Sequence, residues 1–371
     1  MSGYQVQEVK TISAHQSYHG WPTVARLASG ELLVVVSAGR ERHVCPFGQV
    51  HLIRSTDNGA TWTGPEILAN GPLDDRDAGI MQTRDGTVLV NWFTSVAALR
   101  RLKAAEEQGD EALRKIGDDG FIARCRKMQA ALAPAVIRRE LGVWMRRSED
   151  GGRTWSDKYK VAPGAGAPHG PLELSDGRLL FIGTWNAHAM SGAAQDQARP
   201  LLGARLSKDG GRTWRRIGEI PQRPGDAPGV YHEPHAVQAP DGRIVVHIRN
   251  HSEQDRSHVL QSESDDGGRT FSVPHTTGLV GLPAHLLTLR DGRLLSTFGY
   301  RALPYGIRAS ISADSGRTWG EPMILDEKPV SHDLGYPSTV ELADGSLFSV
   351  WYEKLPDQPL ASVQAARWSL A

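Results

Sequence analysis

The sequence predicts an all-β fold, a six-bladed β-propeller, and the prediction depends on two interleaved repeats. The first repeat is Ser-x-Asp-x-Gly-x-Thr-aromatic, a pattern typical of tight hairpins, because Asp accepts bonds within its own turn and Gly supplies a positive φ. Its five copies span residues 55–62, 148–155, 207–214, 264–271 and 312–319. One copy would indicate an ordinary turn, whereas five copies at quasi-regular spacing indicate a repeat architecture.

The second repeat consists of an apolar strand, a tight turn and another apolar strand. Its turns lie at residues 28–30, 85–86, 176–177, 241–242, 291–292 and 344–345. Six strand pairs and five hairpin boxes together predict a four-stranded unit that is repeated six times.

The last blade lacks a box, so we expect the two ends of the chain to build it together. Its third strand is predicted over residues 362–370, and its fourth over residues 5–12 at the N-terminus. This closure covers strand edges that an open sheet would expose. The whole chain, residues 1–371, is therefore predicted to form a single propeller domain.

The faces of the propeller follow from the strand order. In an up-and-down blade the boxes and the first-to-second turns share one face. The starts of the inner strands and the second-to-third loops share the other face, over the central channel. We expect the functional site on this second face.

Residues 97–139 interrupt the strand pattern with helical composition and periodicity. They fall in the second-to-third loop of blade 2, and therefore on the functional face. Two interpretations remain open, a lid over the channel and a surface for homo-oligomer contact.

Composition excludes several classes of protein. The formal net charge is zero, so a nucleic-acid partner or an anionic membrane is not expected. No apolar run of membrane-spanning length occurs, and the N-terminus lacks a secretion-signal pattern. A cytoplasmic location is expected, although a secreted form whose signal has been removed stays open. No metal or cofactor motif is present.

Titratable groups gather at the predicted starts of the inner strands. A concave site over the channel requires such convergence. These candidates are His19, Asp74, Asp75, Arg76, Asp77, His169, Glu233, His235, His285 and Tyr336.

The boxes match the Asp-box, or BNR, repeats of the sialidase superfamily, and the chain resembles a divergent sialidase. The segment Gly335-Tyr336-Pro-Ser, followed later by Glu353, resembles the one that carries the sialidase tyrosine nucleophile and a later glutamate. Glu233 resembles the glutamate that assists this tyrosine. Arg249 resembles the second substrate-binding arginine.

Arg308 resembles the third arginine of the sialidase family, with Arg301 as a nearby competitor. The implied chemistry is coherent. A neutral phenol avoids repulsion from an anionic sugar, a carboxylate takes its proton, and arginine binds a substrate carboxylate in a bidentate manner.

Two positions depart from the family pattern. Gly20 stands where the resemblance implies the first arginine, and the loop at residues 39–46 has no Asp to act as the general acid. Arg40 and Arg42 are the alternative candidates for an arginine that projects inward. The candidates for the proton donor are Asp75, Asp77, Glu41 and His43. These departures favour an acidic sugar other than sialic acid.

Asp75 and Asp77 flank Arg76, and this arrangement supports two interpretations. With Asp74, the group is either an ion-pair network that orders the entry to blade 2 or a source of the general acid, because neighbouring carboxylates raise one another's pKa. Both interpretations stay open. Arg76 is also a candidate substrate contact.

Four histidines, His43, His169, His235 and His285, are candidate substrate contacts. A histidine acting with Tyr336 would also permit β-elimination on a uronate. The sequence therefore predicts an exo-glycoside hydrolase for a terminal acidic sugar of a glycan, with a polysaccharide lyase and a non-catalytic glycan-binding propeller as alternatives.

Overall fold

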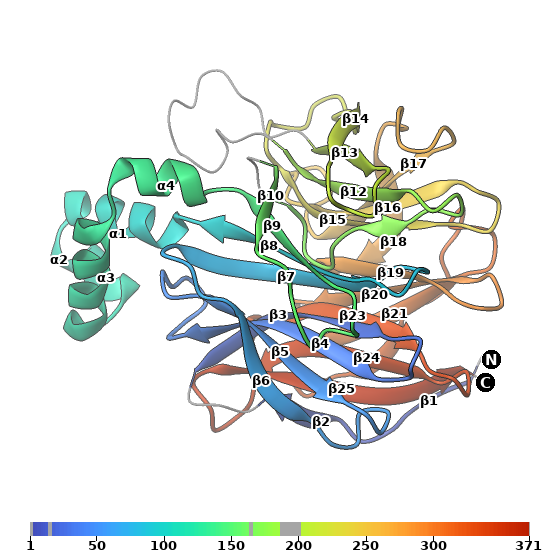
Figure 1. The fold of residues 1–371 in the computed structure, drawn as a ribbon. Coiled ribbons are helices and arrows are strands. Elements are labelled where there is room, and N and C mark those ends of the chain that lie inside the picture. The colour runs from blue at the N-terminus through green and yellow to red at the C-terminus, as the bar shows by residue number, and fades with distance from the viewer. Residues whose placement is uncertain (1–2, 14–16, 163–165, 186–201, 371) are drawn as a thin grey trace.

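The computed structural model describes residues 3–13, 17–162, 166–185 and 202–370 and confirms the six-bladed β-propeller (Figure 1). Its sheets are antiparallel, and each contains four strands in chain order apart from the one that closes the ring. The first three blades are β3 (Tyr18–Arg26), β4 (Leu32–Arg40), β5 (Gln49–Ser55) and β6 (Thr63–Ala69); β7 (Asp74–Gln82), β8 (Val88–Ser95), β9 (Val143–Ser148) and β10 (Tyr159–Ala162); and β11 (Leu172–Glu173), β12 (Leu179–Thr184), β13 (Leu202–Ser207) and β14 (Arg215–Glu219).

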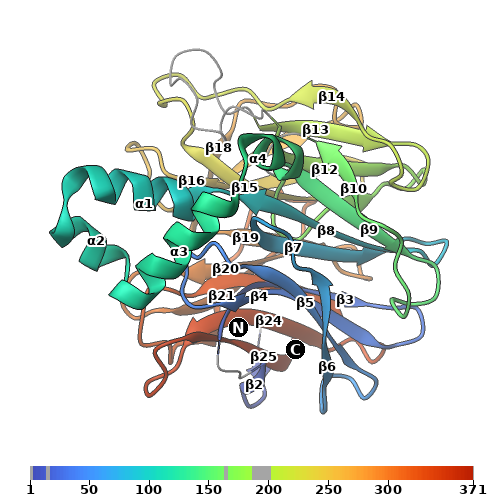
Figure 2. The same cartoon turned by 60° about the vertical axis from the view of Figure 1, so that its left-hand side comes forward.

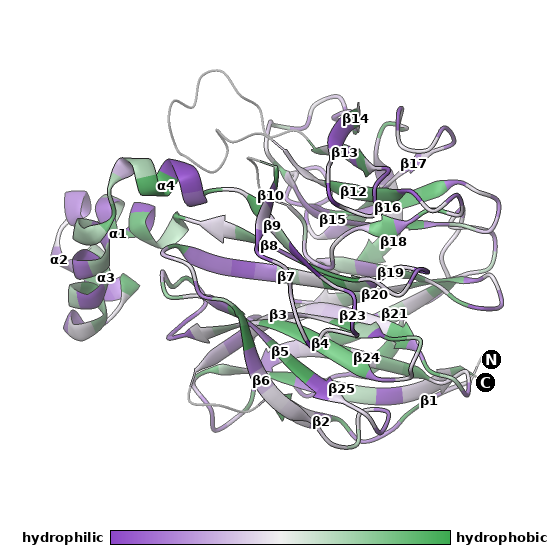
Figure 3. Ribbon diagram, in the orientation of Figure 1, coloured by the Kyte–Doolittle hydropathy of each residue, from purple (hydrophilic) through white to green (hydrophobic). Residues whose placement is uncertain are grey.

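The next two blades follow the same pattern. They comprise β15 (Tyr231–Gln238), β16 (Ile244–Asn250), β17 (His258–Ser264) and β18 (His275–Val280), then β19 (Ala284–Thr288), β20 (Leu294–Tyr300), β21 (Gly306–Ser312) and β22 (Met323–Asp326). The central strands of the blades are apolar and buried, because each is covered by a neighbouring blade on both faces. Figure 3 shows this for β4, which is strongly hydrophobic over most of its length.

Blade 6 combines the two ends of the chain. Its strands β23 (Gly335–Glu341), β24 (Leu347–Lys354) and β25 (Ala361–Leu370) are completed by β1 (Tyr4–Val6) and β2 (Lys10–Ser13). Tyr4 pairs with Leu370, and Lys10 pairs with Ala365. The predicted closure by the N-terminal residues is confirmed, and the termini lie together in Figure 1.

The hairpin boxes tie neighbouring blades together. In the first box, Ser55 Oγ donates to Asp57 Oδ1 (2.8 Å) and accepts from the Gly59 amide (2.9 Å). Asp57 accepts from the Thr61 amide at 2.9 Å, which closes the turn. Trp62 then packs beside Phe348 of β24, with 6.0 Å between ring centroids. The first box therefore joins blade 1 to blade 6.

The insertion in blade 2 forms helices that project from one side of the propeller (Figures 1 and 2). They are α1 (Ala97–Gln108), α2 (Asp110–Ile116), α3 (Asp119–Ala131) and α4 (Pro134–Glu140). Asp118 caps α3 by accepting from the Phe121 amide at 2.7 Å. Leu102 of α1 and Phe121 of α3 pack on Cys45 in the β4–β5 loop. The insertion is thus anchored to blade 1, on the face where the inner strands start.

None of the helices in the described residues is long and apolar enough to cross a membrane.

Candidate functional site

Near the starts of five inner strands, one residue adopts the left-handed backbone conformation. These residues are Trp21 (φ 55°), Asp77 (φ 52°), His169 (φ 73°), Glu233 (φ 42°) and Tyr336 (φ 51°). In four of the five blades this residue lies in a bulge where the register to the second strand shifts, namely in β3, β7, β15 and β23. Such a conformation costs of order 1–3 kcal/mol in a non-glycine residue and concentrates at functional sites. A bulge also redirects a side chain, here at the mouth of the channel.

Tyr336, Glu233 and Arg249 contact one another at this mouth. The Tyr336 hydroxyl donates to Glu233 Oε1 at 2.6 Å. Arg249 Nη1 donates to Glu233 Oε2 at 2.6 Å and to the Tyr336 oxygen at 3.0 Å. The Glu233 and Arg249 side chains are 21% and 15% exposed, so the group is reached from solvent. The structure brings these three predicted residues together from blades 4 and 6.

The charges in this group keep the phenol protonated and the carboxyl ionised. Burial and the negative charge of Glu233 raise the pKa of Tyr336 well above its usual value. Burial opposes ionisation of Glu233, but the Arg249 charge and the Tyr336 hydrogen bond outweigh it and lower the pKa of Glu233 to about 2. Glu233 is therefore an ionised acceptor that already holds the proton of Tyr336 in a short hydrogen bond.

Asp77 and Arg76 lie beside this group, on blade 2. The Asp77 amide donates to Ser37 Oγ at 2.8 Å, which holds the bulge. Arg76 Nε donates to Asp77 Oδ1 at 3.3 Å, and the other carboxylate oxygen has no donor among the described residues. Burial raises the pKa of Asp77 to about 6; Arg76 opposes this shift and the negative charge of Glu233 adds to it.

Arg301 completes a set of three guanidinium groups around the phenol. Its Cζ lies 5.8 Å from the ring centroid of Tyr336. Its Nε donates to the Leu334 carbonyl (3.0 Å), and its Nη2 to Tyr352 Oη (3.4 Å). Arg76, Arg249 and Arg301 thus come from blades 2, 4 and 5.

Sequence reasoning missed an aromatic wall at the mouth. The ring of Trp21 is fully buried, with its centroid 6.2 Å from that of Tyr336 and 5.8 Å from that of Tyr352. The Arg76 guanidinium lies over Trp21 at 4.3 Å from the centroid. Trp21 directly follows Gly20 at the start of an inner strand, and this position was the available signal.

Asp333 and His43 form the rim beside that wall. Asp333 Oδ1 accepts from Tyr18 Oη (2.9 Å) and from Tyr352 Oη (3.2 Å), and it lies 2.8 Å from His43 Nδ1. Burial lowers the pKa of His43 despite the Asp333 charge. His43 is 42% exposed at this rim, where the structure allows contact with a ligand.

Asp75 lies away from the mouth, contrary to our expectation of a catalytic role. Its two carboxylate oxygens accept from Trp92 Nε1 (2.8 Å) and from the Gly71 amide (2.6 Å). Its partners belong to blade 2 and to the loop before it, and the side chain is buried, so Asp75 faces the blade interior. Glu41 is also directed away, since it forms an ion pair with Arg124 of α3.

Arg308 and Glu353 occupy the interior of blades 5 and 6 instead of the mouth. Arg308 donates to the Asp326 carbonyl (2.9 Å) and to Glu327 Oε1 (2.6 Å). Glu353 accepts from Trp351 Nε1 at 2.9 Å. Tyr352, one residue earlier, takes the position at the mouth, and Arg301 takes the one expected of Arg308.

The remaining predicted arginines are also engaged by partners away from Tyr336. Arg40 bonds both oxygens of Asp74, with its Nη2 at 3.2 Å from Oδ2. Arg42 donates to the Ile116 carbonyl of the insertion and lies over the Phe121 ring. Neither arginine contacts the Tyr336 hydroxyl.

His169, His235 and His285 form a buried stack on the channel axis. Their ring centroids lie 4.4–5.4 Å apart. Burial lowers the pKa of each far below its usual value, so the stack is neutral. These histidines do not contact Tyr336, Glu233 or Arg249 in the described structure, contrary to the expectation that they bind substrate directly.

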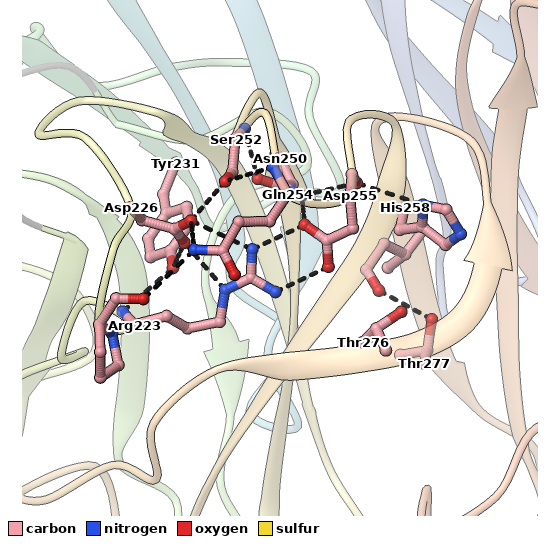
Figure 4. A network of polar contacts seen from close by, with 12 residues as sticks. Arg223, Asp226, Tyr231, Asn250, Ser252, Gln254, Asp255, His258, Thr276 and Thr277 are labelled. Atoms are coloured by element: carbon pink, nitrogen blue, oxygen red, sulfur yellow. Dashed lines mark hydrogen bonds and ion pairs between the residues drawn. The ribbon is translucent and has the colours of Figure 1, made fainter.

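A polar network supports the strand that carries Arg249 (Figure 4). Arg223 donates to both oxygens of Asp255, at 2.7 and 2.6 Å, and to Asp226 Oδ2 at 2.8 Å. Asn250, which follows Arg249, donates to Asp255 Oδ1 at 2.7 Å. The network therefore fixes the turn after β16 beside the segment that leads into Glu233.

No three histidine, cysteine or carboxylate side chains within the described ranges are placed to hold a metal ion.

Comparison with known proteins agrees with this architecture. The family described as BNR repeat-like domain matches residues 126–349, which is more than half of the chain. A sialidase of Micromonospora viridifaciens is 29% identical over 258 residues, 60% of this chain and 36% of that protein. The chain thus spans just over a third of the length of this relative.

Two solved structures share the fold across nearly the whole chain. A protein of unknown function from Dyadobacter fermentans has a TM-score of 0.77 and 22% identity, with complete coverage of both chains. The NanB sialidase of Streptococcus pneumoniae has a TM-score of 0.67 and 14% identity, with 97% of this chain and 71% of that one covered. The chain therefore belongs to the BNR repeat-like domain family and is a divergent member of the sialidase superfamily.

Proposed function

We propose that this protein is an exo-glycoside hydrolase of the sialidase type, which removes a terminal acidic sugar from a glycan. The observation that carries the proposal is the mutual contact of Tyr336, Glu233 and Arg249. Sialidases are the retaining glycosidases with a tyrosine nucleophile. A phenol that donates a short hydrogen bond to an ionised carboxylate is prepared for this role.

In the first chemical step, the Tyr336 oxygen attacks the anomeric carbon as the hydroxyl proton passes to Glu233. Asp77 donates its proton to the glycosidic oxygen, so the leaving group departs as a neutral alcohol. In the second step, the Asp77 carboxylate takes a proton from water, and the water oxygen displaces Tyr336 from the sugar. Glu233 then returns the proton to the phenolate. The pKa of about 6 lets Asp77 serve as acid and then as base.

The preference for an acidic sugar is supported by the three guanidinium groups. Arg76, Arg249 and Arg301 present planar donors around the phenol, an arrangement suited to a carboxylate. Gly20 stands where the resemblance implies the first arginine, and the buried Trp21 follows it. Because Arg76 enters from a different blade, we infer a sugar whose carboxylate is presented differently from that of sialic acid.

The test uses 4-methylumbelliferyl glycosides of sialic acid, uronic acids and matched neutral sugars. We expect turnover of an acidic glycoside and not of its neutral counterpart. Tyr336→Phe should lower kcat by about three orders of magnitude or more, because the nucleophile is removed. Tyr4→Phe, a change on the exposed outer strand β1 of blade 6, is the matched control and should keep full activity.

Three outcomes would contradict the proposal. An active Tyr336→Phe variant would exclude the nucleophile, provided that its melting temperature equals that of the wild type. Unsaturated products that absorb in the ultraviolet, formed from uronate oligosaccharides, would show elimination instead of hydrolysis. Binding without turnover across the whole panel would show a glycan-binding module.

A further inference from the structure

A cavity of about 780 Å³ lies between the helical insertion and the rim of the propeller. One wall comes from α1, α2 and α3, and the opposite wall from the β4–β5 loop and from loops of blades 5 and 6. A volume of this size is typical of small-molecule sites. Of its lining residues, the proposed function uses Arg301 alone.

The cavity is strongly basic. Its cationic lining residues are Arg42, Arg101, Lys115, Arg301 and Lys354, and its acidic lining residue is Asp333. Asp333 is already engaged, since it lies 2.8 Å from His43 Nδ1 and 3.4 Å from Lys354 Nζ. The surrounding hydrogen bonds and charges keep the pKa of Asp333 below its usual value, although burial opposes this. Asp333 is therefore ionised and paired with His43 and Lys354, and it leaves most of the positive charge of the cavity unbalanced.

Three of these guanidinium groups, those of Arg42, Arg101 and Arg301, form no ion pair within the described residues. Arg42 uses Nη1 on the Ile116 carbonyl, and Arg301 bonds the Leu334 carbonyl and Tyr352. Arg101 lies exposed on α1. Guanidinium groups held at a cavity without carboxylate partners favour an anionic ligand.

The cavity also adjoins the proposed reaction site. Arg301 lines it and at the same time lies 5.8 Å from the ring centroid of Tyr336. Asp333 and His43 line it and belong to the aromatic rim. The side toward the insertion includes Leu102 and Phe121, which offer apolar surface for the faces of sugar rings.

We propose that this cavity binds the leaving-group part of the glycan, and that this part carries carboxylate or sulfate groups. The inference rests on the proposed function, because it places a second saccharide next to the sugar held at Tyr336. The helical insertion then contributes to selection of the leaving group, since α1 supplies Arg101 on the side of the cavity away from the propeller.

The binding test uses lactose, singly sulfated lactose and a glucuronate-containing disaccharide, measured by calorimetry on the wild-type protein. We expect at least one anionic disaccharide to bind about tenfold more tightly than lactose, and added salt to reduce this difference. The sulfate and uronate arms identify which anion is preferred.

Arg101→Glu should remove the preference for the anionic probe, with a loss of about tenfold or more in affinity, because the charge of the wall is reversed. Lys103→Glu is the matched control, because Lys103 lies on the same helix but does not line the cavity. It should bind the probe as the wild type does.

The inference is overturned if no anionic probe exceeds lactose, or if Arg101→Glu binds it as tightly as the wild type. It is also overturned if Arg249→Ala alone abolishes binding, since the anion would then occupy the reaction site. Loss of the proposed function has a separate signature, namely activity that survives in Tyr336→Phe. In that case the anion site at Arg101 would remain valid, but the bound anion would not be the leaving group of the reaction.

Discussion

Asp77 is the carboxyl group best placed to exchange a proton with a leaving group at the mouth. It lies in a strained bulge with φ 52°, bonded through one oxygen to Arg76, and its pKa is raised to about 6. A group of this kind is protonated in a useful fraction of molecules near neutral pH, unlike an ordinary aspartate.

We predict that Asp77→Asn slows hydrolysis of alkyl-linked glycosides by about 10²–10⁴-fold. Hydrolysis of a nitrophenyl glycoside should fall much less, because that leaving group departs without a proton. In the wild type, kcat/KM should fall as the pH rises through about 6, since the acid form of Asp77 is then lost. Steady-state kinetics across pH, with both leaving groups, measure these effects. Equal losses on the two substrates would contradict a role as general acid.

The two candidate arginines of blade 5 should behave oppositely. Arg301→Ala removes a guanidinium beside Tyr336 and should raise KM for an acidic glycoside about tenfold or more, with little change in melting temperature. Arg308→Ala removes buried bonds to the Asp326 carbonyl and to Glu327, and should mainly lower the melting temperature. Kinetics and thermal unfolding on both variants decide the assignment. A raised KM confined to Arg308→Ala would reverse it.

Strands β22 and β24 bring two buried carboxyl groups together, and one of the two groups retains its proton. Glu353 lies beside Asp326, and burial together with the Asp326 charge raises the pKa of Glu353 to about 8. Trp351 Nε1 donates to Glu353 Oε2 at 2.9 Å, which opposes the shift without cancelling it. The pair therefore contributes to stability only while Glu353 is protonated.

This pair makes stability depend on pH in a defined direction. The unfolded chain releases the Glu353 proton near pH 4.5, whereas the folded chain holds it up to about pH 8. The folded state binds more protons across this window, so the free energy of unfolding should fall as the pH rises.

Glu353→Gln should remove this dependence. The free energy of unfolding of the variant, relative to that of the wild type, should be a few kcal/mol higher at pH 8 than at pH 5. Denaturant unfolding of both proteins at several pH values measures the effect. Parallel stability curves for the two proteins would contradict it.

At the scale of the whole molecule, blade 6 depends on both ends of the chain. β25 pairs with β24 on one side and with β1 and β2 on the other. Val6 and Ile12 pack against the cores beneath blade 6. Because β23 of the same blade carries Tyr336, closure of the ring and construction of the site are linked.

Deletion of residues 1–13 should expose the edge of β25 and lower the free energy of unfolding by several kcal/mol, since ladder bonds and partly buried apolar side chains are lost. Activity should fall with the stability of blade 6. Deletion of residues 1–3 alone is the control and should behave as the wild type. Thermal unfolding and light scattering measure both deletions, and a full truncation that melts normally would show that closure is dispensable.

Local patterns in the sequence were sufficient for the architecture and for part of the site. Each box is an eight-residue unit whose Ser, Asp, Gly and Thr bond to one another, so its identity and count could be read without tertiary information. Blade closure followed from counting these units. Tyr336, Glu233 and Arg249 were found because they lie in recognisable positions at strand starts and ends, and the structure brings them into contact.

The sequence by itself determined the repeat number and the closure of the ring, and it named Tyr336, Glu233 and Arg249, which the structure brings into contact. The tertiary structure alone decided which candidate residue lies at the mouth. Tyr352 lies there and Glu353 does not, Asp77 does and Asp75 does not, and Arg301 does and Arg308 does not.

Arg301 and Arg308 lie on different segments, and the fold decides which of them reaches the phenol. Tyr352 and Glu353 differ because adjacent side chains of a strand point to opposite faces. Asp77 points to the mouth because the bulge between Arg76 and Gly79 shifts the alternation that would otherwise place it on the side of Asp75. That shift is set by packing between blades, which no local pattern records.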